Sequence, residues 1–198
     1  MSDETADPGA REPTPASRGY HKLAHALDEF ALDPTGLQCA DLGCSTGGFV
    51  DCLLRRGAET VYAVDTAYGE LAYRLRTDDR VIVLERTNAL HVEPPKLVDL
   101  VTIDLGWTRQ AKAIAAAQRW LKPSGRIVTL IKPHYELDTD ELDRIAPGRV
   151  LADDDAERIA REVAESLPGF VRMTRSPIRG GARRKGPGNL EWLALLEL

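Results

Sequence analysis

A glycine-rich loop after a predicted strand is the first place in this sequence where residue types and spacing indicate a binding site. Residues 41–49 read Asp-Leu-Gly-Cys-Ser-Thr-Gly-Gly-Phe, so the glycines are spaced G-x-x-x-G-G and an aspartate stands two residues before the first. Glycine lets the backbone approach a ligand at the carboxyl edge of a strand, where open α/β sheets bind their ligands. A dinucleotide site would need G-x-G-x-x-G. The Asp41 carboxylate instead predicts a cationic group, and a sulfonium with an amino-acid tail fits that description.

A second acidic residue, Asp65, ends the next predicted strand. A carboxylate at this position of a doubly wound sheet accepts hydrogen bonds from ribose hydroxyls, so the sequence predicts a nucleoside in the ligand. Asn88, after the third predicted strand, is placed to face an adenine edge. The alternative is that the glycines only permit a turn and that Asp65 caps the segment after it.

Metal, disulfide and membrane chemistry have no comparable support. The four histidines lack the spacing of metal ligands, and three cysteines are an odd number that suits a reducing compartment better than a disulfide framework. The sequence contains no run of eighteen apolar residues, and its first sixteen residues are polar and acidic, unlike a signal peptide. We therefore predict a cytoplasmic protein with no metal site and no membrane association.

The glycine loop and Asp65 belong to an alternation of short apolar runs and helical segments. An amphipathic helix begins near Gly19 and ends at Asp33-Pro34. Strands are predicted at 39–42, 61–65, 81–84, 98–104 and 127–131, and helices at 48–56, 70–76, 110–121 and 156–167. Two further strands, 170–174 and 190–198, form either a wide hairpin or two separate edge strands. Apolar strands separated by helices indicate an α/β fold with one doubly wound, mostly parallel, seven-stranded sheet.

Composition sets the expected boundary of this single domain. Residues 1–16 hold three prolines among acids and small residues. Such a segment has too little apolar surface to offset the entropy lost on ordering. We therefore expect a disordered leader over 1–16 and one domain over 17–198.

The overall charge conceals a basic segment near the C-terminus. The chain has 26 basic and 31 acidic residues, a net charge of −5. Residues 172–188 nevertheless contain six cations and no acid: Arg172, Arg175, Arg179, Arg183, Arg184 and Lys185. This asymmetry is typical of a local polyanion site on an acidic protein, and the alternative is a solvated basic loop.

Several short stretches, in this order, resemble the FtsJ-type ribose methyltransferases, and among them the TlyA (hemolysin A) branch that methylates ribosomal RNA. The matching stretches are 41–49, 51–54, 62–65, Tyr68-Gly69, 85–88 and 131–133. The resemblance covers the chain from Ser17 to its end, and it implies a Rossmann-like fold, S-adenosylmethionine as cofactor and RNA, specifically ribosomal RNA, as substrate. The cofactor contacts that follow are Asp41, Gly43, Ser45, Thr46, Gly47, Gly48, Phe49, Asp65, Asn88 and Asp104.

The resemblance also implies a Lys-Asp-Lys-Glu catalytic tetrad, which falls on Lys22, Asp104, Lys132 and Glu191. A ribose hydroxyl is a weak nucleophile at neutral pH, so its methylation needs a basic group within reach. We expect burial and the neighbouring Lys22 to lower the pKa of Lys132, while Asp104 and Glu191 hold the ammonium groups and oppose part of that shift. The alternative for Lys132 is a strand-end lysine that reaches solvent.

Substrate contacts are expected at Arg18, Tyr135, Arg175, Arg179, Arg183, Arg184 and Lys185. Tyr135 is placed to stack on a nucleobase, although a half-buried aromatic at a strand end is an equal alternative. The sequence departs from the family at two places. Members of the TlyA branch carry an S4-like RNA-binding domain where residues 1–16 stand, so we expect a separate RNA-binding partner. The family usually has a Ser-Phe-Ile type segment where this chain has residues 105–108, Leu-Gly-Trp-Thr.

Three functions remain open at this point. The leading hypothesis is methylation of a ribose 2′-hydroxyl in RNA. Methylation of a small hydroxylated molecule keeps the same chemistry without the RNA. A catalytically silent module that binds S-adenosylmethionine and RNA is the third, and tetrad substitutions separate it from the enzymes.

Overall fold

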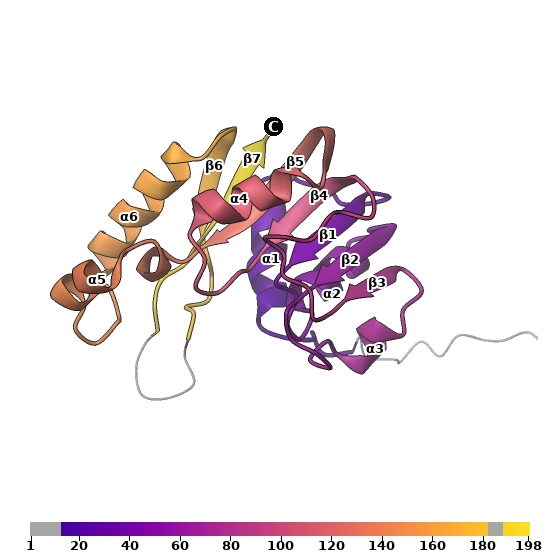
Figure 1. Cartoon of the computed structure of the whole chain (residues 1–198), viewed down its shortest axis with the longest axis horizontal. Coiled ribbons are helices and arrows are strands. Elements are labelled where there is room, and N and C mark those ends of the chain that lie inside the picture. The colour runs from indigo at the N-terminus through magenta and orange to yellow at the C-terminus, as the bar shows by residue number, and fades with distance from the viewer. Residues whose placement is uncertain (1–12, 182–187) are drawn as a thin grey trace, which may run out of the picture.

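Seven strands form one sheet in the order β3-β2-β1-β4-β5-β7-β6 (Figure 1). This computed structural model describes residues 13–181 and 188–198, so Arg183, Arg184 and Lys185 lie outside the described residues, as do residues 1–12. The strands are β1 (Gln38–Leu42), β2 (Thr60–Val64), β3 (Val81–Leu84), β4 (Val98–Ile103), β5 (Leu121–Ile131), β6 (Phe170–Arg175) and β7 (Trp192–Glu197). Strands β1 to β5 pair in parallel, whereas β7 is antiparallel to both β5 and β6. The predicted doubly wound, mostly parallel sheet is confirmed, and the last two strands form the wide hairpin.

Helices cover both faces of the sheet. They are α1 (Gly19–Glu29), α2 (Gly48–Arg55), α3 (Tyr73–Arg76), α4 (Gln110–Gln118), α5 (Thr139–Ile145) and α6 (Asp153–Ser166), with a 3-10 turn, η1, at Pro133–Tyr135. Figure 1 shows α4 in front of the sheet and α1 and α2 behind it, with α6 beside β6 at the left. The buried side chains of α6 belong to the same core as those of α4. The parallel strands are covered by helices on both faces, so their side chains are apolar on both faces. These side chains form two separate hydrophobic cores, one on each face of the sheet.

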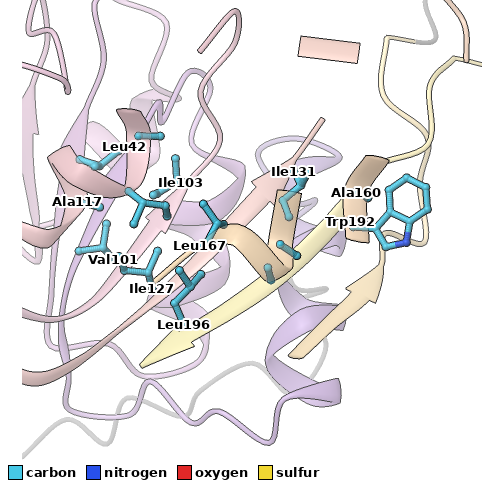
Figure 2. Packing of buried hydrophobic residues seen from close by; sticks show 14 of the residues in the cluster. Leu42, Val101, Ile103, Ala117, Ile127, Ile131, Ala160, Leu167, Trp192 and Leu196 are labelled. Atoms are coloured by element: carbon cyan, nitrogen blue, oxygen red, sulfur yellow. The ribbon is translucent and has the colours of Figure 1, made fainter. Parts of the chain in front are cut away.

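The core in front of the sheet packs α4 and α6 against β4, β5 and β7 (Figure 2). Its members include Ile103, Ile127 and Ile131, all inaccessible to solvent. Each such side chain contributes about 1.5 to 3 kcal/mol by leaving water. Trp120, also fully buried, lies against the ring of Tyr62 at 5.8 Å between centroids. This packing fixes the ends of β4 and β5, from which two of the predicted catalytic residues project.

Several element predictions need correction. Strand β5 begins six residues before the expected 127–131, and α6 begins three residues before the expected 156–167. The helix expected over 70–76 begins only at Tyr73, because Ala72 has an extended backbone (φ −52°, ψ 135°). The helix expected over 110–121 ends at Gln118, and β5 begins at Leu121 because that residue pairs with Val98. Helix α5 was not predicted at all. It begins at a side-chain cap, in which the Asp138 carboxylate accepts the Glu141 N–H at 2.9 Å.

The order of the strands creates the crevice of the fold. The chain leaves β1 toward β2 on one side and returns to β4 on the other, so the connections diverge at the carboxyl ends of β1 and β4. Ligands of open α/β sheets bind at such a switch point. Residues 43–48 follow β1 at this edge, and Asp104 follows β4.

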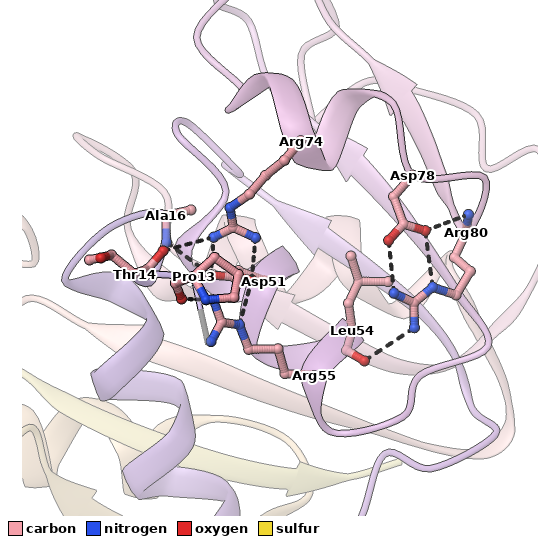
Figure 3. Close-up of polar contacts among 9 residues, drawn as sticks. All are labelled: Pro13, Thr14, Ala16, Asp51, Leu54, Arg55, Arg74, Asp78 and Arg80. Carbon is pink, nitrogen blue, oxygen red and sulfur yellow. Dashed lines mark hydrogen bonds and ion pairs between the residues drawn. The ribbon is translucent and has the colours of Figure 1, made fainter. Parts of the chain in front are cut away.

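A buried carboxylate on α2 anchors the segment that enters the fold (Figure 3). Asp51 accepts the Ala16 N–H and Arg55 Nε–H at 2.9 Å each, and both Nη groups of Arg74 at 2.8 and 2.6 Å. The two guanidinium groups also donate to the carbonyl oxygens of residues 13 and 14, at 2.5 and 3.2 Å. Burial raises the pKa of Asp51, but these donors outweigh it, and the pKa lies below its ordinary value. The last residues before Ser17 are therefore tied to α2 and α3.

The Asp51 anchor predicts a pH-dependent loss of stability. Asp51→Ala should lower the free energy of unfolding at pH 7 by about 2 to 3 kcal/mol, because it removes the buried carboxylate to which two guanidinium groups and the Ala16 N–H donate. A carboxyl with a depressed folded pKa stabilises above its unfolded pKa and loses that contribution as the pH falls through the folded value. Urea denaturation should therefore show a smaller difference from wild type at pH 3 than at pH 7.

Asp28→Ala is the control for this prediction. Asp28 pairs with Arg56 at 2.7 Å, but its side chain is 62% exposed. Removal of such a surface pair should cost less than about 1 kcal/mol. Equal losses of unfolding free energy in Asp51→Ala and Asp28→Ala would refute the anchoring role of Asp51.

Candidate active site

Two cavities lie at the crevice and share Gly43, Ser45 and Asp104. The larger, about 680 Å³, contains most of the predicted catalytic and cofactor residues: Lys22, Asp41, Gly43, Ser45, Thr46, Gly48, Phe49, Asp104, Lys132 and Glu191. The smaller, about 360 Å³, is lined by Asp65 and Asn88, together with residues 105, 106 and 108. Most of the residues singled out in the sequence are thus brought together, although they come from segments far apart in the chain.

The glycine loop turns sharply between β1 and α2. Gly43 has φ +93°, and a Cβ there would lie 2.7 Å from the carbonyl oxygen of Asp104. Only glycine therefore fits between the ends of β1 and β4. The N–H groups of Gly43 and Cys44 both donate to the Val64 carbonyl, at 2.8 and 3.1 Å. This geometry brings bare backbone to the edge shared by the two cavities, as close approach of a ligand requires.

Asp41 is a buried carboxylate, and only one of its two oxygens accepts a hydrogen bond from the described residues. Its side chain is 1% exposed, and its Oδ1 accepts the Thr102 hydroxyl at 2.7 Å. Its Oδ2 is buried with no hydrogen-bond partner among the described residues. Burial raises the pKa of Asp41 to about 8. A cationic group in the cavity would satisfy both the orphaned oxygen and the charge, so the site fits a cofactor with a sulfonium and an amino-acid tail.

Asp65 is fixed at the smaller cavity by two backbone donors. Its Oδ2 accepts the Ser45 N–H and its Oδ1 the Ala67 N–H, both at 2.8 Å. Each carboxylate oxygen keeps a further lone pair, so the group can still accept ribose hydroxyls. Asn88 uses its Oδ1 for the Leu90 N–H at 2.9 Å, which leaves its NH₂ group available to a ligand. The arrangement can hold an adenosine in the smaller cavity.

One lysine–carboxylate pair joins α1 to the residue before β7. Lys22 Nζ lies 2.5 Å from Glu191 Oε2, and the two side chains are only 11% and 4% exposed. Burial raises the pKa of Glu191, although the ammonium of Lys22 opposes this. An ion pair so poorly hydrated depends on its geometry, because neither charge has water as an alternative partner.

The second pair lies across the ends of β4 and β5. Lys132 Nζ forms an ion pair with Asp104 and donates to the Leu105 carbonyl oxygen at 3.3 Å. Burial lowers the pKa of Lys132, but the charges of Asp104 and Glu191 outweigh it, so the pKa lies above its ordinary value. The expected lowering is therefore wrong for the protein without ligand. Direct contact with a carboxylate decides the direction, and it could not be weighed from the sequence.

The predicted substrate contacts separate into different groups. Arg18 is exposed and Tyr135 half-buried, and both line the larger cavity. Tyr135 lies against the rings of His134 and Trp107, with centroids 4.2 and 4.6 Å away. Trp107, at a positive φ of 55°, is 80% exposed. These aromatic rings form a platform at the mouth, beside Lys132.

The basic segment is less free than its sequence indicates. Arg175 is exposed at the end of β6 and lines neither cavity. Arg179 pairs with Asp153 at 2.7 Å, so a compensating acid comes from the start of α6. The absence of acids within 172–188 was therefore misleading for this arginine.

Two of the four histidines that lack metal-ligand spacing line the larger cavity, His21 and His134. Burial, helped by the charge of Lys132, lowers the pKa of His134 to about 4, so its imidazole is neutral at physiological pH. Their adjacency to Lys22 and Lys132 was the available signal. Residues 14–16, Gly180 and Gly181 also line this cavity and were not predicted from the sequence. Ser17 and Asn189 line it as well, and they belong to the segments that place Lys22 and Glu191 in the family resemblance.

Other chemistries find no support in the described ranges. Residues 13–181 and 188–198 contain no group of three His, Cys, Asp or Glu side chains placed to hold a metal ion. Within the same ranges no helix is both long and apolar enough to cross a bilayer. Cys39, Cys44 and Cys52 are free thiols, and burial raises the pKa of Cys39 and Cys52 to about 12, which leaves both unreactive.

Comparison with known proteins agrees with this geometry. The family model described as FtsJ-like methyltransferase matches residues 15–182. The "16S/23S rRNA (cytidine-2'-O)-methyltransferase TlyA" of Mycobacterium tuberculosis is 39% identical over 188 residues, which cover 91% of this chain and 67% of that protein. "Hemolysin A" of Brachyspira hyodysenteriae is 34% identical over 90% of this chain and 75% of its own. The solved structure of a "Putative hemolysin" from Streptococcus thermophilus is 32% identical, with a TM-score of 0.83 over 95% of this chain and 68% of that chain.

The geometry of Asp65 predicts its contribution to cofactor binding. Asp65→Ala should weaken S-adenosylmethionine binding more than tenfold, or by about 1.5 to 3 kcal/mol, because it removes a charged acceptor for ribose. Asp33→Ala is the matched control, since Asp33 likewise accepts a backbone N–H two residues on, from Thr35 at 2.9 Å, but in an exposed turn. Calorimetry that finds wild-type affinity for Asp65→Ala would remove Asp65 from the site.

The raised pKa of Asp41 predicts proton release on cofactor binding. With a pKa of about 8, the carboxyl is mostly neutral at pH 6.5. A cation beside it lowers that pKa, so binding should release up to about one proton, and affinity should rise with pH below 8. Calorimetry at pH 6.5 in two buffers of different ionisation enthalpy measures the proton, and Asp41→Asn should abolish it. The same proton release in both proteins would show that Asp41 does not meet the cation.

Proposed function

The chain belongs to the FtsJ-like methyltransferase family, and on that premise we propose that it transfers a methyl group to a ribose 2′-hydroxyl of RNA, with ribosomal RNA as the substrate class. Members of this family use S-adenosylmethionine, and the glycine loop, Asp41 and Asp65 fit it. The observation that carries the proposal is the meeting of two lysine–carboxylate pairs in the cavity beside the glycine loop. The relative from M. tuberculosis, named as an rRNA (cytidine-2'-O)-methyltransferase, supports the same substrate class.

The two pairs suit proton removal from a hydroxyl. S-adenosylmethionine supplies an electrophilic methyl group when bound. As the ribose oxygen gains that methyl it must lose its proton, and a base within hydrogen-bond reach has to take it. Lys132 can do so once it is neutral, and a positive charge brought into the cavity lowers its pKa toward that state. Asp104 holds Nζ at the edge shared by the two cavities.

Lys22 and Glu191 complete a cluster with no net charge. Two ammonium groups and two carboxylates balance, and of the two pairs Lys22–Glu191 is the more deeply buried. Such balance lets buried charges persist, because an isolated ion there would cost several kcal/mol. We assign Lys22 to orienting the hydroxyl and Glu191 to holding Lys22 in place.

The mouth of the cavity suits a nucleotide better than a small alcohol. Single-stranded RNA is commonly recognised by bases that stack on aromatic side chains, and Tyr135 with Trp107 offers such a surface. Arg18, exposed at the same cavity, has a charge available for phosphate. We assign the methyltransferase domain to 17–198 and its place to the cytoplasm, a compartment that suits three unpaired thiols.

The deciding experiment identifies the methylated atom. The protein is incubated with labelled S-adenosylmethionine and total RNA, and the RNA is then hydrolysed in alkali. A 2′-methylated ribose cannot assist cleavage of its own phosphodiester, so label should remain in alkali-resistant dinucleotides. Label that is released as mononucleotides would refute ribose methylation, and label found only in small molecules would favour the alternative substrate. Activity that needs cell extract would indicate the separate RNA-binding partner included in this proposal.

Loss of Lys132 should stop chemistry without unfolding the protein. Lys132→Ala should cut turnover about a hundredfold or more, while the affinity for S-adenosylmethionine stays close to wild type. The melting temperature should also stay close to wild type, because the Asp104 carboxylate that loses its partner is 27% exposed and can be hydrated. Lys122→Ala is the matched control, because Lys122 also pairs with an aspartate, Asp99 at 2.9 Å, but outside both cavities. If Lys132→Ala keeps most of its turnover, Lys132 is not catalytic, and the alternative of a strand-end lysine applies.

A further inference from the structure

The chain on either side of the β6–β7 connection continues to pair beyond the two strands. The Ser176 N–H donates to the Glu191 carbonyl, and the Gly180 N–H to the Asn189 carbonyl, both at 2.9 Å. Gly180 and Asn189 form an antiparallel bridge. Residues 176–180 therefore run directly beside the backbone that carries Glu191.

Gly180 lies against the carboxylate of Glu191. A Cβ built on Gly180 would overlap Oε1 and Cδ of Glu191. Gly180 has no positive φ, so its backbone conformation does not itself require glycine. Space for the carboxylate, and not the turn, is what requires glycine at this position.

The backbone around Gly180 is held against movement. Asn189 accepts the Leu151 N–H through Oδ1 at 3.0 Å and donates to the Arg149 carbonyl through Nδ2 at 2.8 Å. On the opposite strand, Arg179 pairs with Asp153 at 2.7 Å. Both sides of the bridge are thus tied to residues 149–153, which lead from the loop after α5 into the start of α6, so the backbone cannot easily withdraw to admit a methyl group at Gly180.

We propose that Gly180 is a positioning residue for methyl transfer: the room left by its missing side chain is where the Glu191 carboxylate pairs with Lys22, and Asn189 keeps that room at a fixed width. The inference rests on the proposed function, since it assigns Gly180 a role through the Lys22–Glu191 pair. Lys22 and Glu191 are almost without water, so a displaced carboxylate leaves the ammonium without a substitute partner. Displacements of about 1 Å at a catalytic group can cost a hundredfold in rate.

Gly180→Ala tests the proposal directly, with labelled S-adenosylmethionine and total RNA as substrates. We expect kcat to fall about ten- to a hundredfold, while the calorimetric affinity for S-adenosylmethionine stays within about twofold. Gly148→Ala is the matched control, because a Cβ at Gly148 meets no atom within 4 Å and its φ is not positive. It should leave kcat unchanged. Wild-type kcat in Gly180→Ala would overturn the proposal.

A second substitution separates positioning from general damage. Aspartate is one methylene shorter than glutamate, so Glu191→Asp in the Gly180→Ala background makes room for the added methyl group. We expect this double variant to turn over several-fold faster than Gly180→Ala alone, although Glu191→Asp in the wild-type background should be slower than wild type. A double variant no faster than Gly180→Ala would overturn the proposal. Should Gly180→Ala fail to fold, recovery of folding in the double variant supports the steric account, and continued misfolding refutes it.

Glu191→Gln distinguishes this inference from the function on which it rests. If Glu191→Gln keeps full kcat, the catalytic pair itself is wrong, and the inference falls with it. If Glu191→Gln is inactive while Gly180→Ala is fully active, the proposed function stands and only the role of Gly180 is refuted.

Discussion

Four ionised side chains that meet at one cavity, two of them almost without contact with solvent, impose the strictest requirement on this fold. Lys22 comes from α1, Asp104 and Lys132 follow β4 and β5, and Glu191 precedes β7. An unpaired charge at this depth is costly. The four segments must therefore bring each lysine into contact with its carboxylate when the protein folds. The sheet order meets this requirement, because β4, β5 and β7 are consecutive neighbours and α1 packs across them from behind.

The antiparallel direction of β7 explains why its acid comes before the strand, whereas Asp104 and Lys132 follow theirs. Because β7 runs opposite to β5, its first residues lie at the carboxyl end of β5, where Ile131 pairs with Trp192. Glu191 therefore arrives at the same sheet edge as Lys132 while its chain is entering the sheet. The chain first runs along β6 toward this edge of the sheet and then reverses into β7, and this reversal places Glu191 at the crevice after the five parallel strands.

Much of the fold followed from the sequence, because apolar runs and glycines report local requirements. The five parallel strands and the turn at Gly43 are of this kind. Helix α5 was not predicted because residues 139–145 contain only two apolar side chains, Leu142 and Ile145, and its start depends on a cap at Asp138. The net pKa direction of Lys132 and the partner of Arg179 depend on distances between remote segments, which spacing along the chain does not encode.

The three tryptophans occupy unlike surroundings, and this gives the protein a built-in optical reporter. Trp120 and Trp192 are buried in the core, whereas Trp107 stands in solvent against Tyr135 at the mouth of the larger cavity. An indole in water emits at longer wavelength than one in an apolar interior. The long-wavelength part of the intrinsic tryptophan emission therefore comes mainly from Trp107. Changes in that part of the emission report events at the mouth of the larger cavity in the native protein, without any attached label.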